Sequence, residues 1–126
     1  MNNQIEEIEL AKKAMLQAYD PYTHFKVGAV LVTKSGKKYT GCNIANHGIQ
    51  SICAERVAFA KAISEGEKSF ERIVIVGGET IDTLEECLPC GYCRQFMSEF
   101  VAQDFKIVTI EKEYTLQELL PYKFNL

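Results

Sequence analysis

Two short cysteine motifs restrict the folds open to this chain more than any other feature of its sequence. Cys53-Ala54-Glu55 and Pro89-Cys90-Gly91-Tyr92-Cys93 each stand at the start of a segment that is predicted to be helical. The beginning of a helix carries the positive end of its dipole and free N–H groups, which favour the thiolate form of cysteine that a metal requires. Two such helix ends could share one cation, and the fold would then have to bring them side by side.

The spacing of these cysteines predicts a zinc site with one open position. Cys90 and Cys93 are separated by two residues, so both sulfurs can face one tetrahedral centre from a single turn. Together with Cys53 they offer three thiolates to one Zn²⁺ per chain and leave the fourth position for water. Glu55 follows a ligand by two residues and could move protons between water and a substrate nitrogen. An open zinc site of this kind with a glutamate beside it is typical of zinc deaminases, which remove an amino group by hydrolysis.

A closed structural zinc module is the main alternative. Cys87 precedes Cys90 by three residues, so Cys87, Cys90 and Cys93 could contribute three ligands of a four-sulfur shell. The fourth would be Cys53 or Cys42. Structural sites usually contain two paired ligand knuckles, whereas Cys53 stands in an isolated Cys-x-Glu, which favours the open site. We therefore expect Cys87 to be a loop thiol and Cys42 a small core residue on a strand.

One arginine and two histidines are further polar candidates near the site. Three thiolates weaken zinc as a Lewis acid, and the Arg56 guanidinium could correct this by donating hydrogen bonds to ligand sulfurs. The alternative for Arg56 is an ordinary surface position. His24 and His47 are the only histidines, and neither has metal-ligand spacing to another histidine. They are predicted to be loop or pocket residues.

The order of the predicted elements indicates an α/β fold. Helices are predicted over residues 4–18, 53–64, from Pro89 onward and over 115–120, and strands over 27–32, 38–44, 72–77 and 106–110. Strands that alternate with helices in this way indicate an α/β sandwich. A chain of 126 residues with 47% hydrophobic and 25% charged residues is predicted to form a single domain spanning residues 1–126.

Charge and composition argue against a nucleic acid or a membrane as the binding partner. The net charge of −3 comes without any run of lysine or arginine, which argues against binding of a nucleic-acid polymer. No stretch has the length of a membrane span, and the polar start Met1-Asn2-Asn3-Gln4 lacks the apolar region of a signal peptide. An odd number of cysteines does not suit a secreted disulfide framework. We therefore expect a cytoplasmic protein that acts on a small molecule without a membrane partner.

Several segments distributed nearly end to end along the chain share a family resemblance. They are Tyr22-Thr23-His24-Phe25, Val27-Gly28-Ala29, Thr40-Gly41-Cys42-Asn43-Ile44, Cys53-Ala54-Glu55-Arg56, Pro89-Cys90-Gly91, Cys93-Arg94-Gln95 and Glu118-Leu119-Leu120-Pro121. In this order they resemble the cytidine deaminase family, specifically its small type with three cysteines, one zinc per chain and a homotetrameric assembly. The resemblance implies a three-layer α/β/α sandwich around a mixed five-stranded sheet.

The resemblance also implies an activity and a set of substrate contacts. The activity is hydrolysis of the 4-amino group of cytidine or deoxycytidine to the uridine product and ammonia, as in pyrimidine salvage. By the same resemblance Glu55 would bond the ring N3 and the amino group, and Phe25 would pack on the nucleoside. Asn43 would contact the ribose, and the backbone at Ala54 would help to hold the base.

The ribose-binding segment departs from the family pattern. Family members usually read Asn-x-Glu-Asn, with the glutamate on the ribose 3′-hydroxyl, whereas this chain reads Asn43-Ile44-Ala45-Asn46. Ala45 cannot accept that hydrogen bond, and its loss would cost about 1–3 kcal/mol, or about one to two decades in binding. The following loop, residues 47–52, is one residue shorter than usual and lacks the usual tyrosine.

These departures leave the identity of the nucleoside open. Asn46, His47 and Gln50 are the candidates to replace the missing partner of the sugar. Blasticidin-S deaminases resemble this chain in the zinc core and also diverge in this segment. An aminonucleoside compound such as blasticidin S, or another modified cytosine, is therefore the alternative substrate.

Overall fold

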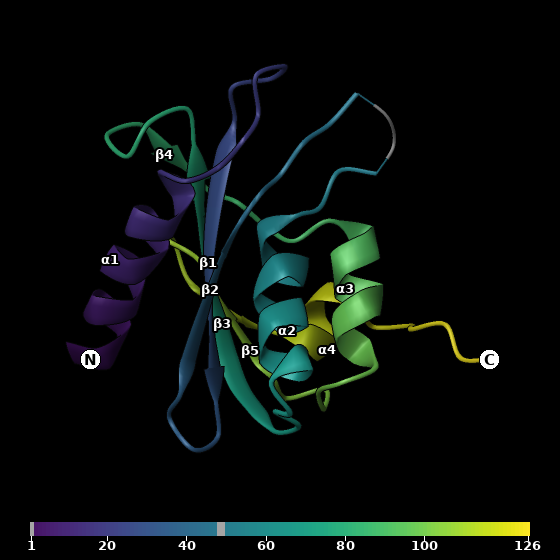
Figure 1. Ribbon diagram of the computed structural model, residues 1–126. Helices are drawn as coiled ribbons and strands as arrows, with labels where there is room; N and C mark the ends of the chain where they lie inside the picture. Colours follow the sequence, from purple (N-terminus) through teal and green to yellow (C-terminus); the bar gives the residue numbers. More distant parts are fainter. Residues whose placement is uncertain (1, 48–49) are drawn as a thin grey trace.

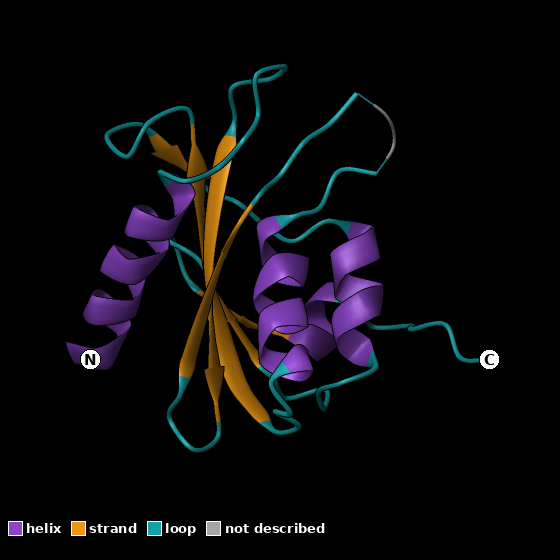
Figure 2. Cartoon of the chain, viewed as in Figure 1, coloured by secondary structure: helices purple, strands orange, loops and turns teal. Residues whose placement is uncertain are grey.

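A mixed β-sheet forms the middle layer of the fold and helices cover both of its faces (Figure 1, Figure 2). The coordinates are a computed structural model that describes residues 2–47 and 50–126. The strands are β1 (Lys26–Thr33), β2 (Lys38–Cys42), β3 (Phe70–Gly78), β4 (Leu84–Glu85), β5 (Lys106–Val108) and β6 (Glu113–Thr115). The helices are α1 (Asn2–Met15), α2 (Ala54–Ser64), α3 (Gly91–Ser98) and α4 (Leu116–Leu119). No helix among these residues is both long and apolar enough to cross a membrane.

The sheet has the strand order β2-β1-β3-β5-β6. β3 and β5 pair in parallel, and the other neighbouring strands pair antiparallel. The two-residue strand β4 lies off this path and pairs antiparallel with the end of β3. The prediction of a three-layer sandwich around a mixed sheet of five strands is therefore confirmed, with β4 as a short addition.

Helix α1 alone covers one face of the sheet (Figure 1). Ala11 and Met15 are fully buried against valines of β1, β3 and β5. Gly28 permits a close approach, since a Cβ there would lie 2.0 Å from the carbonyl oxygen of Ala11. Glu7, also fully buried, accepts two hydrogen bonds from the Arg72 guanidinium of β3, at 2.8 and 2.5 Å.

Helices α2, α3 and α4 cover the opposite face and enclose the larger part of the core. Phe59 of α2 is fully buried at its centre, and four rings lie with centroids 5.2 to 6.2 Å from its own: Phe70, Phe96, Phe100 and Phe105. Gly41 of β2 brings the start of α2 against the sheet, because a Cβ there would lie 2.4 Å from the carbonyl oxygen of Ala54. This contact fixes the height of Cys53 and Glu55 above the sheet.

The predicted elements all exist, but several boundaries differ. Helix α1 ends at Met15 rather than at residue 18, because the N–H groups of residues 16–18 bond to carbonyl oxygens three residues back instead of four. Strand β2 ends at Cys42, and Ile44 forms isolated bridges with Tyr19 and Ile52 instead. Strands β4 and β6 were not expected, since pieces of two and three polar-rich residues carry too little periodicity to predict.

Candidate metal centre and active site

The beginnings of α2 and α3 lie side by side and bring three cysteines together. Cys53 is the N-cap residue of α2, Cys90 is the N-cap residue of α3, and Cys93 lies in the first turn of α3. Their sulfur atoms all lie within 4.8 Å of one another, with Cys53 and Cys90 3.9 Å apart. Zinc–sulfur bonds of about 2.3 Å in a tetrahedral centre place sulfurs about 3.8 Å apart. The three thiols are therefore suited to hold a zinc ion.

Local contacts hold Cys90 and Cys93 in place. The Cys93 backbone N–H donates to Cys90 Sγ at 3.5 Å, which caps the start of α3. Arg94 ties this turn to the C-terminal part of the chain: Nε donates to the Pro89 carbonyl at 2.7 Å and Nη1 donates to the Leu119 carbonyl at 2.9 Å. Sequence reasoning did not assign Arg94 a role, since its partners lie on separate segments; its position directly after Cys93 was the only signal.

The thiols of the cluster differ in their readiness to ionise. A hydrogen bond from the Cys93 thiol, helped by Arg56 and Cys90, lowers the pKa of Cys53 to about 5. The same hydrogen bond and burial raise the pKa of Cys93 well above its usual range. Of these two thiols, Cys53 at the start of α2 is therefore the one that ionises more readily.

Glu55 stands in the first turn of α2 and is only 4% exposed. Burial raises the pKa of its carboxyl group to about 7, with a further rise from the Cys53 charge and an opposing effect of Arg56. Its neighbour Arg56 places Nη2 at 3.3 Å from the Ser51 carbonyl oxygen and at 3.7 Å from Cys53 Sγ. The buried carboxyl group of Glu55 and the cationic side chain of Arg56 thus both lie near Cys53.

Cys42 and Cys87 lie outside the metal cluster formed by the described residues. The four-sulfur shell that the sequence left open is therefore not formed. Cys87 is half-buried beside Gly77, where a Cβ would lie 2.8 Å from its sulfur. Burial raises the pKa of Cys87 to about 12, and the negative charges of Glu55 and Glu86 add to the rise.

This environment predicts that Cys87 is unreactive in the folded protein. With a pKa near 12, its thiolate fraction at pH 8 is on the order of a thousandth of that of an ordinary cysteine, and alkylation needs the thiolate. Iodoacetamide treatment of zinc-loaded protein, followed by peptide mass spectrometry, should leave Cys87 unmodified while the same protein in urea is modified rapidly. Modification of folded protein at the unfolded rate would contradict this.

A cavity of about 260 Å³ opens beside Cys53 and contains part of the expected substrate site. Its lining residues are Asp20, Tyr22, Thr23, Asn43, Ile44, Ala45, Ser51, Ile52 and Cys53. Asn43 and Ala45, which the sequence linked to the sugar, therefore lie at this cavity. Phe25, Ala54 and Asn46 do not line it. The Asn46 N–H donates to Ser51 Oγ at 3.3 Å, across the neck of the loop.

Asn43 holds the edge of this cavity together. Its Oδ1 accepts from the Val27 N–H at 2.8 Å and its Nδ2 donates to the Phe25 carbonyl at 2.9 Å. Its backbone joins the same region, since its carbonyl oxygen accepts from the Tyr19 N–H at 3.0 Å. The side chain thus links the segment of Phe25 to the end of β2, a structural role that the sequence did not reveal.

Replacement of Asn43 with aspartate should test this link. Aspartate cannot donate to the Phe25 carbonyl and places a negative charge against it, so the free energy of unfolding should fall by about 1–3 kcal/mol. Urea denaturation measures the change, with Asn125→Asp in the exposed C-terminal tail as the matched control. Equal stability of the two variants would show that the link contributes nothing.

The two histidines lie outside the sulfur cluster. His47 places its ring 5.4 Å from that of Tyr22, which lines the cavity. His24 adopts a positive φ of 62° in the loop that precedes β1. Gly48 and Ile49 lie outside the described residues, so the shortened loop is described only at its two ends, where Gln50 is exposed.

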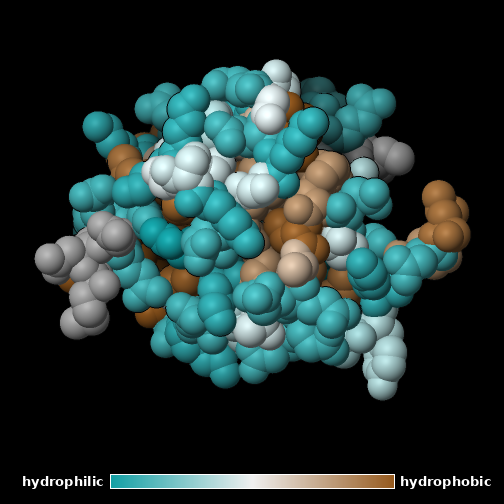
Figure 3. Space-filling model, turned by 90° about the horizontal axis from the view of Figure 1, so that it is seen from below, coloured by the Kyte–Doolittle hydropathy of each residue, from teal (hydrophilic) through white to brown (hydrophobic). Residues whose placement is uncertain are grey.

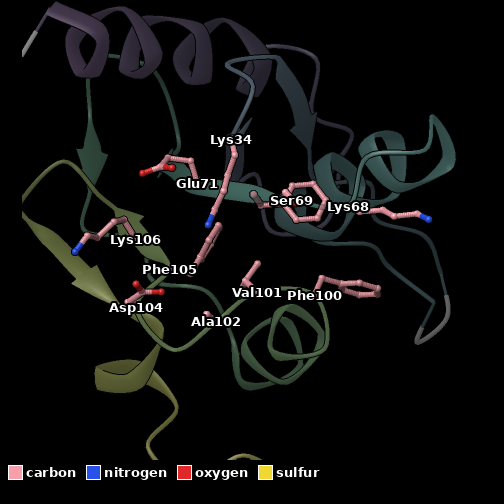
Figure 4. A pocket seen from close by; sticks show the side chains of 11 residues that line it. Lys34, Lys68, Ser69, Glu71, Phe100, Val101, Ala102, Asp104, Phe105 and Lys106 are labelled. Carbon is pink, nitrogen blue, oxygen red and sulfur yellow. The ribbon is translucent and has the colours of Figure 1, made fainter.

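A second cavity of about 250 Å³ lies at the other end of the molecule, where β3 and β5 begin (Figure 4). Lysines and acids share its lining: Lys34, Lys68, Lys106, Glu71 and Asp104. Figure 3 views this end, where an apolar patch is set among hydrophilic residues. None of the three clustered cysteines lines this cavity, and it has no part in the site.

Comparison with known proteins points to one family. Residues 1–109 match the family described as "Cytidine and deoxycytidylate deaminase zinc-binding region". Cytidine deaminase of Sporosarcina psychrophila is 40% identical over 91% of this chain and 86% of its own length. The crystal structure of cytidine deaminase from Burkholderia pseudomallei matches with a TM-score of 0.85 and 37% identity, over 95% of this chain and 98% of that one. Blasticidin-S deaminase of Bacillus cereus is 30% identical over 96% of this chain and 91% of its own length.

Proposed function

This chain belongs to the cytidine deaminase family of zinc hydrolases, and we propose that it hydrolyses the 4-amino group of cytidine or deoxycytidine. Water replaces the amino group, so the products are the uridine nucleoside and ammonia. The observation that carries the proposal is the juxtaposition of three thiols, spaced for one zinc ion, with the buried carboxyl of Glu55.

Each polar residue of the site has a role in this proposal. Cys53, Cys90 and Cys93 would hold the zinc ion, which when bound supplies Lewis-acid activation of water. Glu55 would take one proton from the attacking water and deliver it to the pyrimidine N3, and would then move the second hydrogen of that water to the amino nitrogen, which leaves as ammonia. Arg56 would reduce the electron donation of the Cys53 thiolate through its Nη2 contact.

The substrate contacts are proposed from the cavity and the family resemblance together. Asn43 uses one amide hydrogen for the Phe25 carbonyl and retains a second donor for a sugar hydroxyl. Phe25 would pack on the nucleoside, and the Ala54 backbone would hold the base. Asn46 stands at the neck of the loop, where it could reach the sugar.

Blasticidin S or a related aminonucleoside is the second candidate substrate. Ala45 lines the cavity with a methyl group, which cannot accept a hydrogen bond from a ribose hydroxyl. The relative from Bacillus cereus, named blasticidin-S deaminase, covers nearly the whole chain at 30% identity. The same zinc chemistry would serve both substrates, so the choice between them depends on how the sugar is bound.

We further propose a homotetramer that works in the cytoplasm in pyrimidine salvage. Several apolar side chains near the cavity and the metal turn are exposed in the single chain: Ile44, Ile52 and Leu88. Subunit contacts would cover such residues. Sedimentation equilibrium at micromolar protein concentration measures the mass of the assembly. A mass of four chains is expected, and a mass of one chain would contradict the tetramer.

A substrate panel tests the proposed function. Zinc-loaded protein would be incubated with cytidine, deoxycytidine, cytosine and blasticidin S, and the loss of ultraviolet absorbance and the release of ammonia would be followed. Turnover of cytidine or deoxycytidine with release of one ammonia per nucleoside is the expected result. Turnover of blasticidin S alone would favour the second candidate. Absence of turnover with all four compounds, in protein with a full zinc content, would reject the proposal.

A further inference from the structure

The residue between Gly91 and Cys93 places an aromatic ring over the arginine of the metal site. Tyr92 lies in the first turn of α3, and the centroid of its ring is 4.1 Å from Arg56 Cζ. Arg56 itself belongs to α2. The contact therefore joins the two helices whose beginnings supply the three cysteines.

Arg56 has few other partners that fix its position. Nη2 reaches the Ser51 carbonyl oxygen and Cys53 Sγ, at 3.3 and 3.7 Å, and the guanidinium also interacts with the Cys93 thiol. Nε is buried, and no hydrogen-bond acceptor among the described residues reaches it. A guanidinium with an incomplete set of acceptors gains from the electron-rich face of an aromatic ring.

The ring has no comparable partner of its own. Tyr92 is 66% exposed, and its cation–π contact with Arg56 is its one contact of this kind among residues 2–47 and 50–126. A large aromatic side chain at an exposed position contributes little to a core, so its packing on the guanidinium is its principal structural effect.

We propose that Tyr92 is a positioning residue for the metal site, acting through Arg56. By stacking on the guanidinium it holds Nη2 against Cys53 Sγ. A hydrogen bond from a cation withdraws electron density from a thiolate, which strengthens the metal as a Lewis acid and stabilises the charged ligand set. Tyr92 thus helps to set the electronic character of the first zinc ligand from the helix that supplies the other two.

The test uses variants that separate the ring from its hydroxyl group. Tyr92→Leu removes the π face, whereas Tyr92→Phe keeps it, and Tyr122→Leu changes a tyrosine that is 93% exposed in the C-terminal tail. Each is also made in an Arg56→Gln background. Two readouts are followed that need no substrate: the sulfur-to-cobalt charge-transfer band of Co²⁺-substituted protein, and the rate of zinc transfer to a chromophoric chelator.

For Tyr92→Leu the charge-transfer band should move to lower energy, because Cys53 donates more strongly once Arg56 is free to leave it. Zinc transfer should become about two- to five-fold faster, the range expected of an exposed cation–π contact. Tyr92→Phe and Tyr122→Leu should resemble the parent protein, and Tyr92→Leu should have no further effect in the Arg56→Gln background.

Two results would overturn the inference: an unchanged band and transfer rate for Tyr92→Leu, or a full effect of Tyr92→Leu in the absence of Arg56. The inference rests on the zinc site of the proposed function, but its readouts do not involve turnover. A protein that binds Co²⁺ through three thiolates and deaminates none of the four compounds would reject the proposed function and leave this inference standing.

Discussion

Replacement of Glu55 with glutamine should lower kcat by about 10²–10⁴-fold while the protein keeps its zinc, because general acid–base catalysis contributes on this scale. Glutamine has nearly the same shape as glutamate but can neither take a proton from water nor return one to a substrate nitrogen. The carboxyl group lies outside the cluster of three sulfurs, so its loss removes no proposed metal ligand. Zinc content by atomic emission and steady-state kinetics measure the two quantities on one sample.

Glu99→Gln provides the matched control for this experiment. It makes the same chemical change at an exposed glutamate at the end of α3, and it should leave kcat and zinc content unchanged. A Glu55→Gln protein that turns over at the rate of the control would refute the assigned role of Glu55. Loss of zinc from Glu55→Gln would mean instead that the carboxylate is a metal ligand.

Removal of the buried carboxylate of Glu7 should cost about 3–5 kcal/mol in the free energy of unfolding. Glu7 is fully buried between α1 and the sheet, and both of its oxygens accept hydrogen bonds from Arg72. Lys38 adds a third positive contact at 3.7 Å. Glu7→Ala would leave the Arg72 guanidinium without its partner and open a cavity under α1, and the two losses add.

Glu9, two residues after Glu7 on the same helix, offers a control. Its carboxylate is exposed and pairs with Lys12 at 3.0 Å, and exposed pairs of this kind contribute no more than about 1 kcal/mol. Urea denaturation should therefore separate Glu7→Ala clearly from Glu9→Ala. Similar midpoints for the two variants would show that the buried ion pair does not hold α1 on the sheet.

The parts of the site that the sequence predicted are those that depend on local spacing. Cys90 and Cys93 lie on one helical turn, so their separation determines that both sulfurs face the same side. Cys53 begins another helix, and since helix N-termini favour thiolates, the sequence could suggest that the two helix ends share one cation. The long apolar segment of β3 was equally clear, since a strand buried on both faces shows a continuous β-branched run.

The parts that escaped prediction depend on contacts between distant segments. Asn43 bonds the backbone of residues 25 and 27, Arg94 bonds the carbonyl of Leu119, and Glu7 pairs with Arg72. No periodicity or motif records such partners, because the tertiary arrangement alone brings them within reach. The choice between three and four sulfur ligands likewise needed the structure, which places Cys87 outside the cluster of described residues.

The boundaries of α4 and α1 also differed in how well the sequence predicted them. The last helix was predicted over residues 115–120, before Pro121, and the structure adds that Thr115 and Glu118 form a capping box at its start. The end of α1 was less predictable, because the residues that follow Met15 remain compatible with a helix and only their packing turns the chain towards β1.

X-ray absorption at the zinc edge tests the central claim of an open three-thiolate centre most directly. An open centre should give three sulfur scatterers at about 2.3 Å and one oxygen or nitrogen at about 2.0 Å, since a catalytic site keeps its fourth position for water. Four sulfur scatterers with no light atom would contradict it. That result would mean that a further cysteine closes the shell, that the metal is structural, and that Glu55 has no water to act upon.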